Sequence, residues 1–431
     1  MSLYDKLSVK LLLDRMRGVS DASEAFGVFC AYGLGHENIK VVLALEDYVA
    51  HDSFGMFERI SKIDYVVPYY QGSQILVLSR DTVKAGFENK KADLLIDYTV
   101  MFDTNVASFI STMFRGRSLK GNHDRVIKLL DAIIYGDYNF DHLFYMCENI
   151  KLVRVKAERW KGNKVDFWRS LKKDFRWNIS ALMYFRMIDC GRYVKSSQLS
   201  FGCSFRQAVR KARDTAFDYY VSPRGRDAAR AVVLMQREML LLLLVAIRIN
   251  FSSGRGARSK FKELLYEVQN LIGVFHEREL SVLLAYFQDS KSVAILGAVN
   301  KGGRIKKLLK RVDNIAWDFF TPRSMELVIN ATSTEKIMLP FLATFDENLS
   351  SMLDMFSIKG SVLSVDEGLH LPVGSDSQVG MFEEFGVMGD IEAIFSEEMI
   401  ERRSVVRSKT IEEQFIKIKS EYAKLRAVMR A

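Results

Sequence analysis

Scarce cysteine, scarce proline and the lack of long apolar runs exclude several classes of protein. The 431 residues include four scattered cysteines and no C-x-x-C pair, which argues against a disulfide framework or a zinc knuckle and favours a reducing compartment. With 5 prolines and 26 glycines, collagen-like and linker-dominated architectures are excluded. The longest apolar run, Met239 to Ile247, has nine residues. A bilayer span needs about twenty, so we expect a buried helix there and no membrane partner.

Motifs for several common chemistries are missing as well. Gly254-Arg255-Gly256 and Gly302-Gly303 lack the spacing and the strand-to-helix context of phosphate-binding loops. No G-x-S-x-G elbow is present, which disfavours an acyl hydrolase. The six histidines form no metal-ligand spacing, and we expect His142 to be structural rather than a general base. No secretory signal is evident at the N-terminus, so the expected location is cytoplasmic.

The composition indicates a folded, basic protein. A hydrophobic fraction of 48% and a charged fraction of 27% are close to the globular average, and a wholly disordered chain is excluded. Lysine and arginine exceed aspartate and glutamate by nine. This surplus favours phosphate-rich partners without proving them.

The first third of the chain predicts mixed α/β structure. In a segment over 1–91 we expect a helix at 3–17 and short strands at 41–45, 65–70 and 74–79, the last two joined as a hairpin through Gln71-Gly72-Ser73. A largely apolar strand over 92–102 then runs into a turn and a helix at about 106–114.

The rest of the chain predicts long helices and a return to α/β structure. Residues 120–311 have apolar side chains at three- and four-residue spacing and few prolines, which predicts a mostly helical region. Over 312–355 we expect a helix from Trp317 and a strand at 337–345. Residues 356–392 are rich in glycine and serine and read as a long surface excursion. A charged amphipathic helix at 410–430 closes the 356–431 segment, and its apolar stripe offers a route to self-association.

Three aspartates stand where strands end or a helix begins. Asp103 follows the apolar strand in Val100-Met101-Phe102-Asp103-Thr104-Asn105, Asp318 is expected to open a helix, and Asp346 closes the strand that ends Ala343-Thr344-Phe345-Asp346. Ligands bind at the carboxyl ends of strands in an open parallel sheet, so these acids are expected to converge. Clustered carboxylates repel unless a cation neutralises them, and Mg²⁺ or Mn²⁺ prefers oxygen ligands.

These runs resemble the motifs of PIN-like nucleases. The Asp103-Thr104-Asn105-Val106 run is similar to the family's opening motif, and Ala343-Thr344-Phe345-Asp346 is similar to its closing strand-Thr-x-Asp motif. Asp318 resembles the third acid. The resemblance covers residues 92–116 and 312–355. It implies a Rossmann-like α/β/α core split over 92–119 and 312–355, interrupted by a large helical insertion over 120–311.

The resemblance also implies an activity and roles for single residues. The family consists of ribonucleases that use acids to hold Mg²⁺ or Mn²⁺ and activate water for phosphodiester hydrolysis. Asp103, Asp318 and Asp346 would bind metal. Asn105 would orient Asp103 or contact the substrate phosphate, and Thr344 would hydrogen-bond a carboxylate. The wider role implied is that of a toxin-like or phage-defence effector.

The second acid of such a site has two candidates. Glu148 lies 45 residues after Asp103, in a stretch where Asn139 is expected to cap a helix and Asp141 to share its face with Glu148. Glu148 is the preferred candidate, and Glu238, just before the apolar run, is the runner-up. Each aspartate also has an ordinary alternative as a helix cap, and Glu148 has one as a solvated helix residue.

Basic segments offer an RNA-binding surface. Residues 151–176 carry a surplus of positive charge with interleaved aromatics, which we expect mainly to pack in the core. Residues 206–213 and 301–311 add two basic stretches, and Lys306, Lys307 and Arg311 in the second are the expected substrate contacts. We therefore predict a metal-dependent endoribonuclease acting on RNA, with DNA as the less favoured substrate. The alternatives are a non-catalytic nucleic-acid-binding or scaffold protein, and an assembly protein whose helices bind protein partners.

Overall fold

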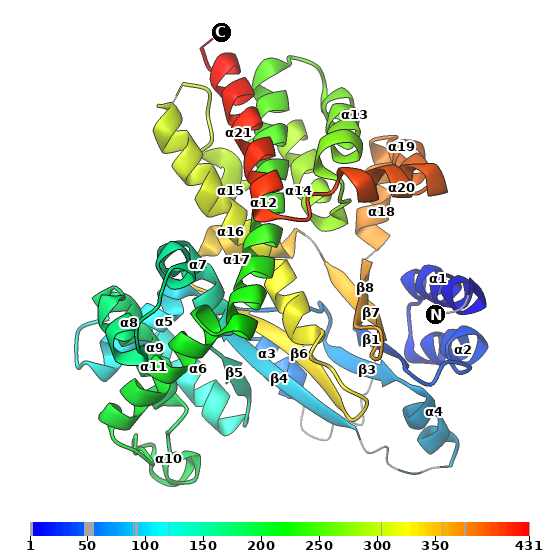
Figure 1. Cartoon of the computed structure of the whole chain (residues 1–431). Helices are drawn as coiled ribbons and strands as arrows, with labels where there is room; N and C mark the ends of the chain where they lie inside the picture. Colours follow the sequence, from blue (N-terminus) through cyan, green and yellow to red (C-terminus); the bar gives the residue numbers. More distant parts are fainter. Residues whose placement is uncertain are drawn as a thin grey trace. The chain divides into compact units, whose positions relative to one another are not determined.

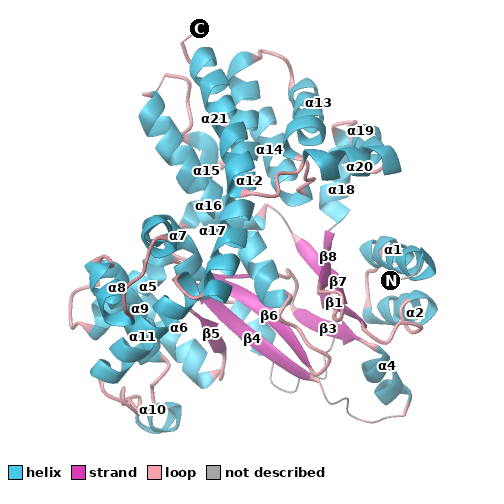
Figure 2. Cartoon of the chain, in the orientation of Figure 1, coloured by secondary structure: helices cyan, strands magenta, loops and turns pink. Residues whose placement is uncertain are grey.

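A computed structural model of the chain describes residues 3–46, 56–88, 90, 94–119, 121–302, 304–355, 357–374 and 376–430. The described chain divides into two compact units. Unit 1 comprises Met1–Ala229, Ser324–Asp346 and Ile358–Val373. Unit 2 comprises Arg230–Arg323, Glu347–Ser357 and Gly374–Ala431. The mixed α/β class predicted from the sequence is confirmed, with the strands gathered into two sheets (Figure 2).

One sheet of unit 1 is centred on two long apolar strands. Its order is β2 (Val66–Pro68), β6 (Lys336–Ala343), β4 (Leu95–Phe102) and β5 (Asn139–Asp141). β4 is parallel to both β5 and β6, and β2 pairs antiparallel with β6. The last six residues of β4 are buried, as expected of a strand covered on both faces. β4 was predicted from Ala92, but residues 91–93 lie outside the described chain.

The other sheet of unit 1 is antiparallel where its pairing is recorded. Its order is β3 (Gln74–Leu78), β1 (Ile39–Leu45), β7 (Ile358–Ser364) and β8 (Leu369–Gly374). Two predictions are wrong here. β2 and β3 do not form a hairpin, because β2 pairs with β6 and β3 with β1. The surface excursion expected at 356–392 instead supplies β7, which is almost wholly buried.

Helices flank both sheets of unit 1. They are α1 (Leu3–Arg17), α2 (Ala22–Tyr32), α3 (Met56–Ser61), α4 (Arg80–Phe87), α5 (Thr104–Phe114), α6 (His123–Tyr135), α7 (Leu143–Glu158), α8 (Lys164–Ser170), α9 (Lys173–Phe185), α10 (Cys190–Ser196) and α11 (Phe205–Tyr220). α9 packs against both α5 and α11, while α5 and α7 contact β4. Figure 1 shows this group beside β4 and β5, with α1 and α2 beside the antiparallel sheet.

In its described part, unit 2 consists of helices joined by loops. α12 (Pro223–Ser252) and α16 (Ile305–Ile329) connect the two units along the chain. The remaining helices are α13 (Ala257–Glu267), the π-helix η1 (Val268–Ile272), α14 (Glu277–Gln288), α15 (Ala294–Gly297), α17 (Glu347–Asp354), α18 (Asp376–Glu384), α19 (Met388–Ile394), α20 (Glu397–Val406) and α21 (Ile411–Val428). The mostly helical character predicted for 120–311 is confirmed, with β5 as the exception.

Two helices of unit 2, α12 and α21, test predictions made from the sequence. Every residue from Met239 to Ile247 in α12 is fully buried, as predicted. None of the described helices is both long enough and apolar enough to cross a bilayer. α21 forms at the predicted place, but it buries Gln414, Ile418, Glu421 and Leu425, whereas Phe415 of the predicted stripe is 63% exposed.

Candidate functional site

Two parallel strands bring the predicted opening and closing motifs together. β4 and β6 run in register from Leu95 opposite Lys336 to Phe102 opposite Ala343. The residues that follow them, Asp103 and Thr344, therefore leave the same edge of the sheet. The backbone N–H of Asp103 continues the pairing by donating to the carbonyl of Ala343 at 3.2 Å. Parallel pairing thus joins segments more than 200 positions apart in sequence.

Asp103 is a buried carboxylate with two defined hydrogen-bond donors. It is 3% exposed, and its Oδ1 accepts from the N–H of Val106 at 2.6 Å, which caps α5. Its Oδ2 accepts from the Thr344 hydroxyl at 2.6 Å. Thr344 Oγ1 in turn accepts from the N–H of Asp346 at 3.1 Å. The Thr-x-Asp turn is thereby fixed against the first acid.

Glu148 lies beside Asp103 at the start of α5, and Glu238 belongs to the other unit. Glu148 is on α7, and its Oε2 accepts from the backbone N–H of Thr104 at 2.9 Å and from the Thr104 hydroxyl at 2.6 Å. Glu238 belongs to unit 2, where its Oε1 lies 3.1 Å from Nε of Arg407. Of the two candidates for the second acid, Glu148 is therefore the neighbour of Asp103.

The electrostatics of the cluster are those of crowded negative charge. Burial and the neighbouring carboxylates of Glu148 and Asp346 together raise the pKa of Asp103 to about 7, against the hydrogen bonds from Thr344 and Val106 that lower it. Burial also raises the pKa of Glu148, opposed by Thr104 and by the charge of Lys151. These shifts favour the protonated forms, so the ionised cluster would be stabilised by a cation.

Capping alone does not account for this arrangement. The alternative role of Asp103 as an N-cap is real, because its Oδ1 caps α5. A cap needs one acceptor oxygen and works well on the surface. Here the capping carboxylate is buried beside two further acids, Glu148 and Asp346, which both act to raise its pKa. Strongly shifted carboxyl groups of this kind mark candidate functional sites.

The donor chemistry suits a hard divalent cation, although the side chains would have to close around it. Carboxylate and hydroxyl oxygens are the ligands that Mg²⁺ and Mn²⁺ prefer. As they stand, no three His, Cys, Asp or Glu side chains in the described ranges are grouped to hold a metal ion. Asp103 is engaged by Val106 and Thr344, and Glu148 by Thr104. Coordination would require these carboxylates to rotate toward Asp346.

Asp318 does not lie where the sequence predicted it. It was expected to open a helix, but α16 begins at Ile305 and places Asp318 well inside. The reason is that Leu308, Val312 and Ile315 continue the helical spacing upstream and are all buried. Asp318 is half-buried and belongs to unit 2.

The remaining predicted residues have mixed placements. Asn105 is exposed on the first turn of α5, beside the acid cluster in sequence. Lys306, Lys307 and Arg311 are exposed on the first turns of α16, in unit 2. The prediction that Asp141 and Glu148 share one helical face is wrong. Asn139 and Asp141 form β5 and α7 begins only at Leu143, so Asn139 caps no helix there.

Three residues of the site were missed by sequence reasoning. Thr104, the first residue of α5, holds Glu148 through two hydrogen bonds. Lys151, one helical turn beyond Glu148, is the cation that lowers its pKa, and this spacing was a signal available in the sequence. Arg125 on α6 lies 5.2 Å from the ring centroid of Phe345, next to Asp346. Nothing local in the sequence pointed to that contact.

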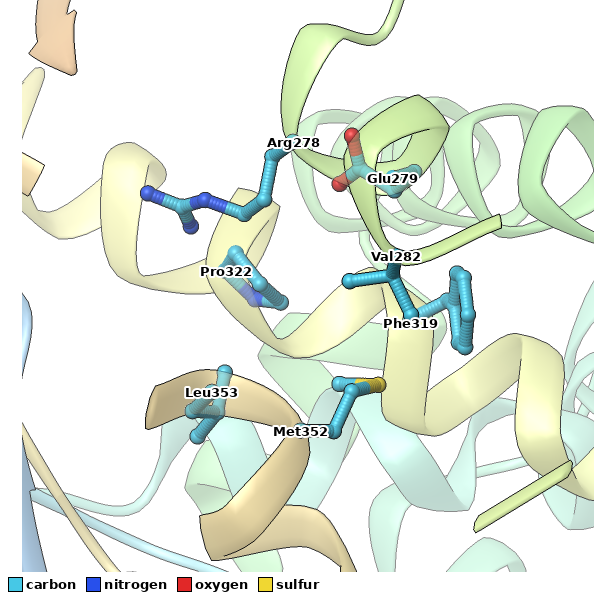
Figure 3. Close-up of a pocket in the computed structure, with 7 residues that line it drawn as sticks. All are labelled: Arg278, Glu279, Val282, Phe319, Pro322, Met352 and Leu353. Atoms are coloured by element: carbon cyan, nitrogen blue, oxygen red, sulfur yellow. The ribbon is translucent and has the colours of Figure 1, made fainter. Parts of the chain in front are cut away.

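A separate cavity lies in unit 2. Figure 3 shows it, lined by apolar side chains that include Val282, Phe319 and Met352, with Arg278 and Glu279 at its edge. Glu279 is paired with Arg323 at 2.6 Å. The apolar lining and the paired charge offer no reactive group, so the acid cluster of unit 1 remains the candidate site.

Comparisons with known proteins assign no family to the chain. No protein-family model matches the sequence. No curated protein and no solved structure shows significant similarity to it. The case for a function therefore depends on the residues themselves.

Proposed function

We propose that this protein is a divalent-metal-dependent endoribonuclease of PIN-like type, with Asp103, Glu148 and Asp346 as its metal-binding acids. The observation that carries the proposal is the buried Asp103 at the end of β4, whose pKa is raised to about 7 by burial together with Glu148 of α7 and Asp346 beyond β6. Such crowding is costly unless the charges serve to bind a cation.

The arrangement of the sheet supports the proposal. β5, β4 and β6 are parallel neighbours, and α5 and α7 follow β4 and β5 along the chain. This order is compatible with the Rossmann-like core that the resemblance implies. Carboxyl ends of parallel strands are where ligands bind in open sheets, and all three acids follow or lie beside those ends.

Each residue then has a defined task. Asp103 and Asp346 would hold Mg²⁺ or Mn²⁺, and Glu148 would bind it directly or through water. When bound, the ion would supply a water of lowered pKa and polarise the scissile phosphate. Thr344 orients Asp103, and Thr104 orients Glu148, through the hydrogen bonds that now hold them. Asn105, exposed beside the cluster, would contact a substrate phosphate.

Roles outside unit 1 stay predictions from the sequence. They comprise Asp318 as a further acid, Lys306, Lys307 and Arg311 as substrate contacts, and self-association through α21. A place in toxin-like action or phage defence is an analogy to the resembled family. Cytoplasmic location likewise rests on the sequence alone.

The experiment is cleavage of end-labelled single-stranded RNA by the full chain, with Mg²⁺ or Mn²⁺ and with a chelator. We expect cleavage by the wild type that needs the metal, and loss of cleavage in Asp103→Asn and Asp346→Asn. The exposed Asp124 on α6 supplies the control, since Asp124→Asn should cleave normally. Cleavage that survives both site substitutions would remove these acids from the reaction.

The second candidate function is binding of nucleic acid without catalysis. The basic surplus of the chain favours it. In that case RNA would be retained without being cut, with or without metal, and Asp346→Asn would leave both retention and RNA length unchanged.

A further inference from the structure

A groove on unit 1 combines aromatic and cationic side chains away from the acid cluster. It lies over α8, α9 and α11 and is lined by Trp168, Lys173, Arg176, Trp177, Phe205 and Val209, among others. No acidic residue is among its lining residues. The groove therefore joins flat apolar surface to unbalanced positive charge.

The aromatic part of the groove is formed by surface rings. Trp177 and Phe205 are stacked, with ring centroids 5.3 Å apart and an interplanar angle of 21°. Both are only half-buried, unlike Phe167 and Phe175 of the same basic segment, which are 0% and 4% exposed. Most aromatics of this segment are core residues, as the sequence predicted. Trp177 departs from that pattern and presents a ring at the surface.

The cationic part surrounds those rings. The guanidinium of Arg115 lies 4.8 Å from the Trp177 ring centroid. Arg176 is half-buried, and its buried Nε has no hydrogen-bond partner among the described residues. A buried donor of this kind is costly until an acceptor reaches it. Lys173 is exposed at the edge. The charges are thus placed for an anionic ligand with a flat apolar group.

Further charges on the neighbouring helix have the same sign. Arg206 and Arg210 are exposed on α11, each one residue beyond the lining residues Phe205 and Val209. The three helices of the groove carry four aspartates. Asp174 is exposed on α9, whereas Asp166, Asp214 and Asp218 lie within 4 Å of Arg169, Arg213 and Lys164. The basic stretch found in the sequence at 206–213 therefore borders this groove.

We propose that the groove binds a nucleotide of single-stranded RNA, with the base against Trp177 and Phe205 and the phosphate at Lys173 and Arg176. Stacking platforms edged by cations are how proteins hold single strands with little sequence preference. The role as a substrate subsite rests on the proposed nuclease function. Asp103 precedes α5 and Arg115 follows it, so the two residues lie about 18 Å apart along the axis of the eleven-residue helix. An extended strand of a few nucleotides reaches from the groove to the acids.

The experiment measures binding of a fluorescein-labelled oligouridylate by anisotropy, using the full chain with Asp346→Asn so that the RNA stays intact. In that background Trp177→Ala should weaken binding about 5- to 150-fold, the range for loss of one stacked base. Trp177→Phe should retain most of the affinity, because a flat ring remains. An oligonucleotide lacking bases should bind Trp177→Ala and its parent equally.

The phosphate contact is tested in the same background. Arg176→Gln should weaken binding and reduce the slope of log affinity against log salt by about 0.7, the value for one contact to a single strand. Controls are Phe415→Ala, which removes a ring that is 63% exposed on α21, and Lys419→Ala, which removes an exposed cation there. Neither should change the affinity or the slope by more than the error. Melting temperatures check that each variant is folded.

The outcomes separate this inference from the proposed function. If folded Trp177→Ala and Arg176→Gln chains bind as tightly and with the same salt slope as their parent, the groove does not hold RNA, whatever the wild type cleaves. If groove-dependent binding is seen but the wild type cleaves nothing, the groove proposal stands and the nuclease proposal fails. Polyglutamate is added as a competitor to both the Trp177→Ala chain and its parent. If the same polyglutamate concentration displaces the RNA from both chains, the groove is a site for acidic protein and the stacking role is overturned.

Discussion

Replacing Asp103 with asparagine should stabilise the fold above neutral pH. The pKa of Asp103 is about 7 in the folded chain against 3.8 as its ordinary value. Between these pH values the folded chain binds a proton that the unfolded chain does not, so stability falls as pH rises through this interval. Above pH 7 the full penalty applies, and three pH units correspond to a ceiling of about 4 kcal/mol.

The expected gain is smaller than that ceiling. Asparagine keeps an oxygen for the N–H of Val106, but its amide must donate to Thr344, which now donates to Asp103. Thr344 Oγ1 already accepts from Asp346, so the hydroxyl proton would need a new acceptor. A cost of about 1–2 kcal/mol for this rearrangement leaves a gain of at most about 2–3 kcal/mol at pH 8. At pH 5, only about one pH unit above the ordinary pKa, the penalty is about 1.6 kcal/mol, so the rearrangement cancels it and the gain should vanish.

The assay is thermal unfolding of the full chain without metal at pH 5 and pH 8. For a chain of 431 residues a gain of this size corresponds to a Tm increase of roughly 2–3 °C at pH 8. Asp97 on β4 is the matched control, at 6% exposed. Burial raises its pKa, but hydrogen bonds from Lys336, Asn139 and Thr99 lower it below the ordinary value. Asp97→Asn should therefore lower Tm at pH 8. If Asp103→Asn lowers Tm there as well, Asp103 is an ordinary satisfied cap.

Three further substitutions test the described contacts by thermal unfolding. Thr344→Val removes the donor to Asp103 and should lower Tm at pH 8 more than at pH 5; equal losses would mean that the hydroxyl does not stabilise the ionised acid. Arg407→Ala removes the cation that hydrogen-bonds buried Glu238 and leaves that carboxylate with the charges of Arg323 and Lys417. It should likewise cost more stability at pH 8 than at pH 5, whereas a pH-independent loss would refute the pairing. Leu243→Ala in the fully buried run of α12 should cost about 2–5 kcal/mol, and a loss below 1 kcal/mol would contradict the packing there.

The local signals of the sequence were sufficient for the main turns of unit 1. An apolar strand, an aspartate and an amphipathic run are enough to predict β4, its turn at Asp103 and α5, because all the determinants are neighbours in sequence. The same holds for β6, although it ends at Ala343, two residues before the predicted end of the strand. Both elements form where predicted.

Strand partners were not predictable from local pattern. β2 and β3 are close in sequence and separated by a glycine-containing turn, yet each pairs with a distant strand. β7 was read as surface because it lies in the stretch 356–392, which is rich in glycine and serine. Its Gly360 packs against the backbone of Val42, where a side chain would collide, so glycine serves close approach of strands rather than exposure.

In the candidate site, too, the local turns were predictable and the long-range contacts were not. The sequence favoured Glu148 and left Glu238 as the runner-up, because both are expected on helices after Asp103. The choice depends on which helix follows β5 back to the end of β4, and α7 does. Asp318 was misplaced for a different reason. A helix was expected from Trp317, while the buried stripe of α16 starts well upstream of that residue.

Binding of Mn²⁺ is the most direct test of the central claim that the acids of unit 1 exist to hold a divalent cation. The free ion is followed by electron paramagnetic resonance while the full chain is titrated at pH 8, for the wild type, Asp346→Asn and the Asp124→Asn control. We predict that the wild type and the control deplete the free signal with the same affinity, and that Asp346→Asn binds at least tenfold more weakly. Equal depletion by all three chains, or none by the wild type, would contradict the account.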